Sequence, residues 1–145
     1  MLPFVVPLLG RGYRLLAVDL PGNGFSARGA TDLLDCSFAL EATNRAVGAF
    51  ESIIAHSFGA TASCAMLARA PQLQTARMVL LSPMRDLAQH LEVVASIARL
   101  SPARTERLQR VVTLGLGSEA SRLSTVQAVR ALPGRGWWCT TATTR

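Results

Sequence analysis

The chain has 145 residues, half of them hydrophobic, which is enough for one compact domain and too little for two ordinary ones. Its fifteen basic residues are all arginine and give a net charge of +6, but no basic cluster is interleaved with aromatic residues, so we expect no nucleic-acid binding. The longest uncharged stretch, Ser52 to Ala68, falls short of the about 20 residues that a membrane span needs, so we expect no membrane insertion.

Taken in chain order, the first predicted element is a helix over Pro3–Leu9, ended by Gly10 and Gly12 and packed on a sheet. Nearly continuous apolar runs then predict three strands covered on both faces: Arg14–Asp19, Ser52–His56 and Arg77–Ser82. Helices are predicted between the strands, over Leu33–Phe50 and Phe58–Arg69. This alternation indicates an α/β fold with a parallel sheet and βαβ crossovers.

After Asp86 the alternation stops and the chain becomes rich in arginine and helical. Helices are predicted over Leu87–Arg99, from Pro102 after an N-cap at Ser101, and over Glu119–Leu132. We therefore divide the chain into a partial core (1–86), a segment of cap-like helices (87–132) and a tail (133–145). The tail holds both tryptophans and several threonines, and this change of composition predicts either disorder or a shifted reading frame.

Ser57 is the candidate nucleophile, because it lies where a predicted strand ends and a helix of small residues begins. A serine on such a tight turn stands out above the sheet when the residues two positions away, here Ala55 and Gly59, are small. The amide of Phe58, in the first turn of the helix, would then stabilise an oxyanion. The simpler alternative is that Ser57 only caps this helix.

The loop after the first predicted strand has the sequence Asp19-Leu20-Pro21-Gly22-Asn23-Gly24-Phe25-Ser26. This D-x-P-G-x-G-x-S loop, followed by the turn at Ser57, resembles the α/β-hydrolase family from about Pro3 to Asp86. Family members usually have histidine where Asn23 stands and often glycine where Ala55 stands. The loop also fits a dinucleotide fingerprint, but no helix is expected to start at its glycines, and the absence of lysine excludes a Walker-type loop.

The resemblance implies an order of nucleophile, acid and histidine along the chain. Asp86 is the candidate acid, with capping of the next helix as the simpler role. His56 directly precedes Ser57, so its side chain leaves the turn in another direction, and we expect His90 to be an exposed residue of a cap helix. Neither histidine is thus expected to be the base, and no later one follows.

The resemblance implies a serine hydrolase that acts on small esters or thioesters and needs no metal or organic cofactor. Without an identified acid and base we expect weak hydrolysis or none. The alternative is a non-catalytic fragment, or an interaction module, that associates with itself through an exposed sheet edge. Three scattered cysteines, Cys36, Cys64 and Cys139, predict reduced thiols, no zinc site and a cytoplasmic location.

Overall fold

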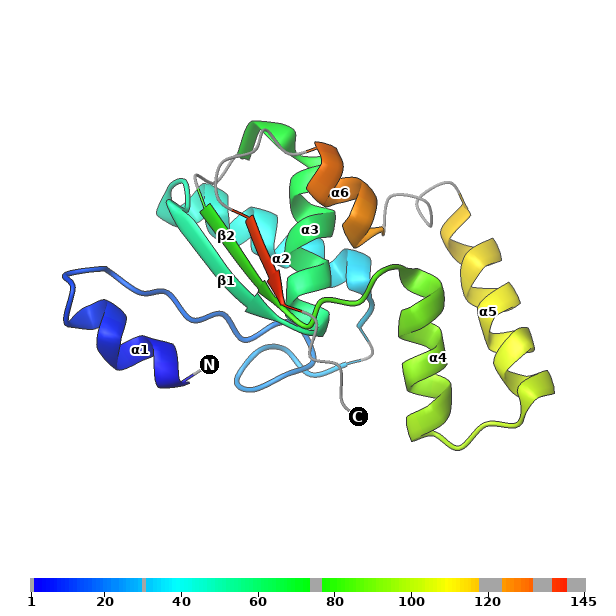
Figure 1. The fold of residues 1–145 in the computed structure, drawn as a ribbon. Helices are drawn as coiled ribbons and strands as arrows, with labels where there is room; N and C mark the ends of the chain where they lie inside the picture. Colours follow the sequence, from blue (N-terminus) through cyan, green and yellow to red (C-terminus); the bar gives the residue numbers. More distant parts are fainter. Residues whose placement is uncertain (1, 30, 74–76, 118–123, 132–136, 141–145) are drawn as a thin grey trace.

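The computed structural model describes residues 2–29, 31–73, 77–117, 124–131 and 137–140 (Figure 1). The described residues contain a parallel sheet in the order β1-β2-β3, with β1 at Ser52–His56, β2 at Arg77–Leu81 and β3 at Trp137–Thr140. The helices are α1 (Leu2–Leu9), α2 (Leu33–Val47), α3 (Phe58–Arg69), α4 (Leu87–Ile97), α5 (Pro102–Leu116) and α6 (Thr125–Ala131). The predicted α/β fold class is confirmed.

Helix α3 connects β1 to β2 and packs on the sheet, as a parallel pair of strands requires. Its side facing the strands contributes Cys64, Met66 and Leu67 to a core that also contains Met78 and Leu80 of β2. The residues of α3 from Ala60 to Leu67 are all buried, and most of them are small. A helix buried on every side with small side chains lets its neighbours approach closely, so α3 forms the centre of the fold.

The other side of α3 is covered by α2 and α4. Leu33 and Cys36 of α2 and Leu87 and Leu91 of α4 form a second core with α3. Partly buried residues of α5 extend this core outward, so α4 and α5 form a helical pair beside the sheet layer (Figure 1). Helix α6 instead lies against α3, with Ala128 in the first core.

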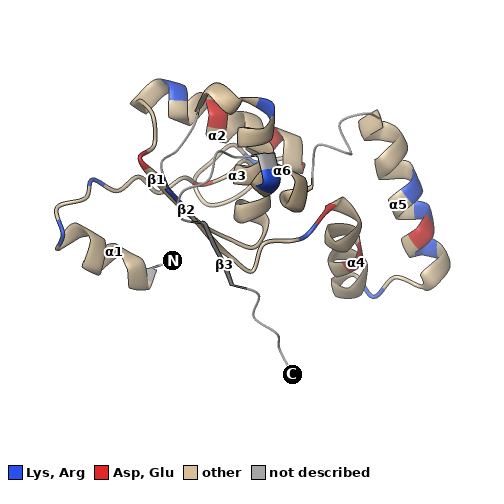
Figure 2. Ribbon diagram, turned by 45° about the horizontal axis from the view of Figure 1, so that its top comes forward, with Lys and Arg blue, Asp and Glu red and all other residues tan. Residues whose placement is uncertain are grey.

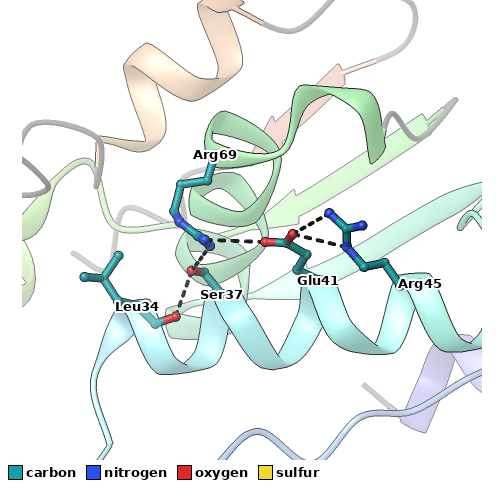
Figure 3. Close-up of polar contacts among 5 residues, drawn as sticks. All are labelled: Leu34, Ser37, Glu41, Arg45 and Arg69. Atoms are coloured by element: carbon teal, nitrogen blue, oxygen red, sulfur yellow. Dashed lines mark hydrogen bonds and ion pairs between the residues drawn. The ribbon is translucent and has the colours of Figure 1, made fainter.

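Arg69 ties α3 to α2 through three contacts, of which Figure 3 shows those to Ser37 and Glu41. Its guanidinium donates to Ser37 Oγ at 3.0 Å and pairs with Glu41 at 3.5 Å. The same group lies 3.7 Å from the centre of the Phe38 ring. Because the Arg69 side chain is only 15% exposed, these contacts are shielded from solvent.

Replacing Arg69 by methionine is expected to lower the free energy of unfolding by about 1–2 kcal/mol, because Ser37 and Glu41 lose a charged, half-buried partner. The matched control is Arg110→Met, since Arg110 and its partner Glu106 are each 71% exposed. That control should change stability by less than about 0.5 kcal/mol. Urea unfolding of the three proteins measures both values; equal effects at the two positions would contradict the role given to Arg69.

The segment predicted as a first strand, Arg14–Asp19, is not a strand. An apolar run becomes a strand only when a neighbouring strand hydrogen-bonds to it. In the described sheet β1 is an edge strand whose neighbour is β2, so Arg14–Asp19 is not paired with β1. Leu15 and Leu16 remain 37% and 53% exposed. Helix α1 forms as predicted but stands away from the sheet (Figure 1), with Val6 exposed.

The composition predicts that residues 133–145 are a tail, either disordered or from a shifted reading frame, whereas the structure pairs residues 137–140 with β2 as β3. Tryptophan and threonine favour strands, and here that local preference outweighs the change in composition. The remaining residues of this segment, 133–136 and 141–145, lie outside the described ranges. Helix α6, at Thr125–Ala131, falls within the predicted Glu119–Leu132 helix, of which residues 119–123 and 132 lie outside the described ranges. No helix in the described ranges combines the length and apolarity needed to cross a membrane.

Candidate active site

Ser57 lies on the turn between β1 and α3, with a backbone φ of 51° and ψ of −123°. These angles are rare for any residue that has a side chain and cost about 1–3 kcal/mol. The turn is held in place because the Ser57 N–H donates to the Leu81 carbonyl at the end of β2, at 2.9 Å. The predicted strand-to-helix turn is therefore present, with the backbone strain that the sequence led us to expect.

The hydroxyl of Ser57 does not cap α3. Ser57 occupies the N-cap position, but its backbone is not in the extended conformation that capping residues adopt, and its side chain makes no capping hydrogen bond. The simpler alternative, a serine used as a helix cap, is thus wrong for this residue.

The first turn of α3 supplies amide donors beside Ser57. Ala60 and Thr61 both donate to the Ser57 carbonyl, at 3.0 and 3.2 Å. Phe58 lies at the first helical position, where the N–H group has no acceptor within its own helix. Together with the positive end of the helix dipole, this amide suits the stabilisation of a negative oxygen at the turn.

The two small neighbours of Ser57 differ in how much space they have. Ala55 is buried in the core below the turn. At Gly59, however, an added Cβ would meet no described atom within 4 Å. The expectation that both positions must be small is therefore supported at Ala55 but not at Gly59.

Replacing Gly59 by alanine is expected to raise the free energy of unfolding by about 0.5–1 kcal/mol, because alanine favours a helix and the added methyl enters open space. The contrasting control is Gly24→Ala, whose Cβ would lie 2.2 Å from Asp19 Oδ2. Thermal unfolding of both variants measures the difference. Destabilisation by Gly59→Ala would show that the space beside Ser57 is occupied in solution.

Asp19 organises the D-x-P-G-x-G-x-S loop. Its Oδ2 accepts from the Phe25 N–H at 3.0 Å, and its carbonyl accepts from Ser26 Oγ at 2.5 Å. Gly22 and Gly24 have φ values of 77° and 53°, so their predicted use as positive-φ turn positions is confirmed. The next helix begins only at Leu33, which does not fit a dinucleotide fingerprint.

Asp86 caps α4, the simpler of the two roles predicted for it. Its Oδ1 accepts from the Gln89 N–H at 2.9 Å, and its Oδ2 accepts from Arg85 Nε at 2.8 Å. The backbone hydrogen bond to Gln89 and the Arg85 guanidinium lower the pKa of this carboxyl below its ordinary value. Both oxygens are thus engaged by groups other than a histidine.

His90 is not the exposed residue that the sequence predicts. Its ring is half-buried, with its centroid 5.1 Å from that of Phe58 and the two planes tilted by 38°. Its Nδ1 lies 2.8 Å from the sulfur of Met84. Burial lowers the pKa of this imidazole. A sequence signal did exist, because Leu87 is on the buried side of α4 and His90 follows it by three residues, a spacing that puts two side chains next to each other on a helix.

The segment of the chain that contains Ser57 carries no charged residue. Residues 52–63, which include β1 and the first turns of α3, contain no Lys, Arg, Asp or Glu, and the charged bands lie mainly on α2 and α5 (Figure 2). His56 is exposed at the end of β1. An open groove of about 370 Å³ lies between α4 and α5, lined by Glu92 and Glu106 among others, and does not include Ser57.

A family model described as the alpha/beta hydrolase family matches residues 2–143. The match covers the loop at Asp19, the turn at Ser57 and the helices that follow. Neither the curated proteins nor the solved structures give a match to this chain.

Proposed function

The chain belongs to the α/β-hydrolase family, and on that premise we propose that it is a serine hydrolase that uses Ser57 to cleave small esters or thioesters. The observation that carries the proposal is the strained backbone of Ser57. Its N–H donates a hydrogen bond to the Leu81 carbonyl, and its hydroxyl makes no capping hydrogen bond. Strain of this kind persists only where surrounding contacts enforce it, and it concentrates at reactive sites. The absence of charged residues from residues 52–63 favours a neutral acyl group.

In the proposed reaction, Ser57 Oγ attacks the carbonyl carbon while its proton passes to a base. The carbonyl oxygen becomes an oxyanion, which the Phe58 N–H stabilises at the start of α3. The tetrahedral intermediate expels the alcohol or thiol and leaves an acyl group on Ser57. Water then attacks this acyl-enzyme and releases the acid. The steps need no metal ion or organic cofactor.

The proposed turnover is slow. A serine hydrolase with its full set of groups holds the imidazole with a carboxylate, whereas Asp86, the acid suggested by the sequence, bonds to Gln89 and Arg85. With the turn and its amide alone, we expect the rate to exceed that of the uncatalysed reaction in water by about 10³–10⁴-fold. Asp86→Asn, which preserves a side chain able to cap α4, should therefore leave the rate unchanged.

The test is hydrolysis of p-nitrophenyl acetate and an acetyl thioester by the purified chain, its Ser57→Ala variant and its Asp86→Asn variant. The proposal predicts product formation by the wild type and by Asp86→Asn, and release at the background rate by Ser57→Ala. Equal rates for wild type and Ser57→Ala would overturn it.

A second candidate, an interaction module, is favoured by the position of β1 at the edge of the described sheet. An edge strand presents unpaired N–H and C=O groups to which a second copy of the chain can add. Light scattering over a wide range of concentrations tests this. A mass that rises with concentration in the wild type, and not in an Ile54→Pro variant that retains its helical circular dichroism, would support self-association; a constant monomer mass would exclude it.

A further inference from the structure

Helix α1 and the segment that follows it form an arm that packs little on the rest of the chain. Among residues 3–17, Val5 and Leu8 are half-buried and all the others are exposed. The exposed side chains include the apolar Val6 at 76% and Leu9 at 54%. Figure 1 shows α1 apart from the sheet and from the other helices. Because apolar surface gathered in one place marks an interaction site, the arm is a candidate for one.

Helix α1 has no polar side. All of its residues are apolar, and both Phe4 and Val6 are exposed. Residues two positions apart point about 200° apart on a helix, so these two side chains face nearly opposite directions. A groove in a protein partner covers one side of a helix, whereas lipid surrounds it. A helix that is apolar all round belongs in a protein core or in lipid, and α1 is not in the core.

Two arginines and a tyrosine directly follow α1, in a segment where Figure 2 shows two basic positions. The N–H groups of Arg11 and Tyr13 both donate to the Leu8 carbonyl, at 3.0 and 3.2 Å, so the turn folds back on the end of the helix. Residues 1–18 contain no Asp or Glu. In the part of the chain that the structure describes, the ion pairs involve other arginines, which leaves Arg11 and Arg14 without a carboxylate there. Arginine and tyrosine at the end of an apolar helix are typical of the interface of an anionic bilayer.

We propose that this arm binds the surface of an anionic phospholipid bilayer, with α1 in one leaflet and Arg11 and Arg14 at the lipid phosphates. The eight residues of α1 measure about 12 Å, less than half of a hydrocarbon core of about 30 Å, so the helix does not span it. The expectation of no membrane insertion rests on the length of a span and does not cover a helix that enters one leaflet. A second copy fits less well, because joining two arms would bring their unpaired arginines together. The proposal is independent of the role of Ser57.

The test is flotation of the full chain with phospholipid vesicles, which separates bound protein from aggregates. The wild type should float with vesicles of phosphatidylcholine and phosphatidylglycerol, bind less to phosphatidylcholine alone, and be released as the salt concentration rises. Val6→Glu, which puts a charge on the apolar helix, should lower binding by at least about tenfold. The matched control is Leu114→Glu on α5, since Leu114 is 75% exposed and Val6 76%. This control should change binding by less than about twofold.

Paired arginine variants separate the arm from the net charge of the chain. Arg11→Gln together with Arg14→Gln should weaken binding to the anionic vesicles by about fivefold for each arginine. Arg104→Gln together with Arg107→Gln removes the same charge from exposed positions of α5. That second pair should change binding by less than about twofold. Circular dichroism of each variant checks that its helices are retained.

Losses confined to the variants of the arm support the proposal. A wild type that does not float with the anionic vesicles overturns it, and so do equal losses in Val6→Glu and Leu114→Glu or in the two arginine pairs. A wild type that does not float, and whose mass rises with concentration unless Val6 is replaced, would assign the arm to a second copy of the chain instead. Ser57→Ala should float like the wild type, so failure of this proposal leaves the proposed function untouched.

Discussion

Replacing Ser57 by glycine is expected to make the chain more stable and at the same time inert. The backbone at residue 57 has a positive φ of 51°, which glycine adopts without steric cost. Relief of about 1–3 kcal/mol of strain, set against about 0.5–1 kcal/mol of added flexibility in the unfolded chain, leaves a net gain of about 1 kcal/mol. The loss of Oγ removes all acyl transfer at this position.

The matched control is Ser57→Ala, which also lacks Oγ but retains a Cβ and therefore the strain. Urea unfolding should place Ser57→Gly above both the wild type and Ser57→Ala, which should be equal within error. Hydrolysis of p-nitrophenyl acetate should be lost in both variants. If Ser57→Gly were no more stable than Ser57→Ala, the turn would not be strained in solution.

The second large effect is expected at Met66, which fills the centre of the core between α3 and the sheet. Its side chain is fully buried among Leu67, Met78 and Leu80. Met66→Ala removes this packing and leaves a cavity, which should lower the free energy of unfolding by about 2–5 kcal/mol. In a domain of this size such a loss is a large fraction of the total stability.

Leu114→Ala provides the comparison, since Leu114 on α5 is 75% exposed and should tolerate truncation with a change of less than about 0.5 kcal/mol. Circular dichroism during urea unfolding gives both values. Similar small losses at the two positions would mean that α3 does not pack on the sheet as described.

The local signals around Ser57 predicted the structure well. The apolar run Ser52–His56 and the helix Phe58–Arg69 have the predicted bounds, because both are short and the branched residues of the strand change abruptly to the small residues of the helix. The cap at Asp86 was also predictable, since it depends on a contact within three residues along the chain. Features that depend only on residues a few positions apart along the chain can therefore be predicted from the sequence.

Features that depend on distant partners were not predictable. Arg14–Asp19 has a strand pattern, but pairing is supplied by another segment, and β1 pairs with β2 instead. Four residues of the expected tail become β3 because β2 offers an edge. The burial of His90 arises from the packing of α4 against Phe58, which the spacing of Leu87 and Leu91 only partly indicates.

The central claim is that the turn at residue 57 presents a reactive serine, and covalent labelling with a fluorophosphonate probe tests it most directly. Intact mass and peptide mapping of the labelled chain should show one adduct, on Ser57, that is absent from Ser57→Ala. No adduct after prolonged exposure of the folded chain, or an adduct that persists in Ser57→Ala, would contradict the claim.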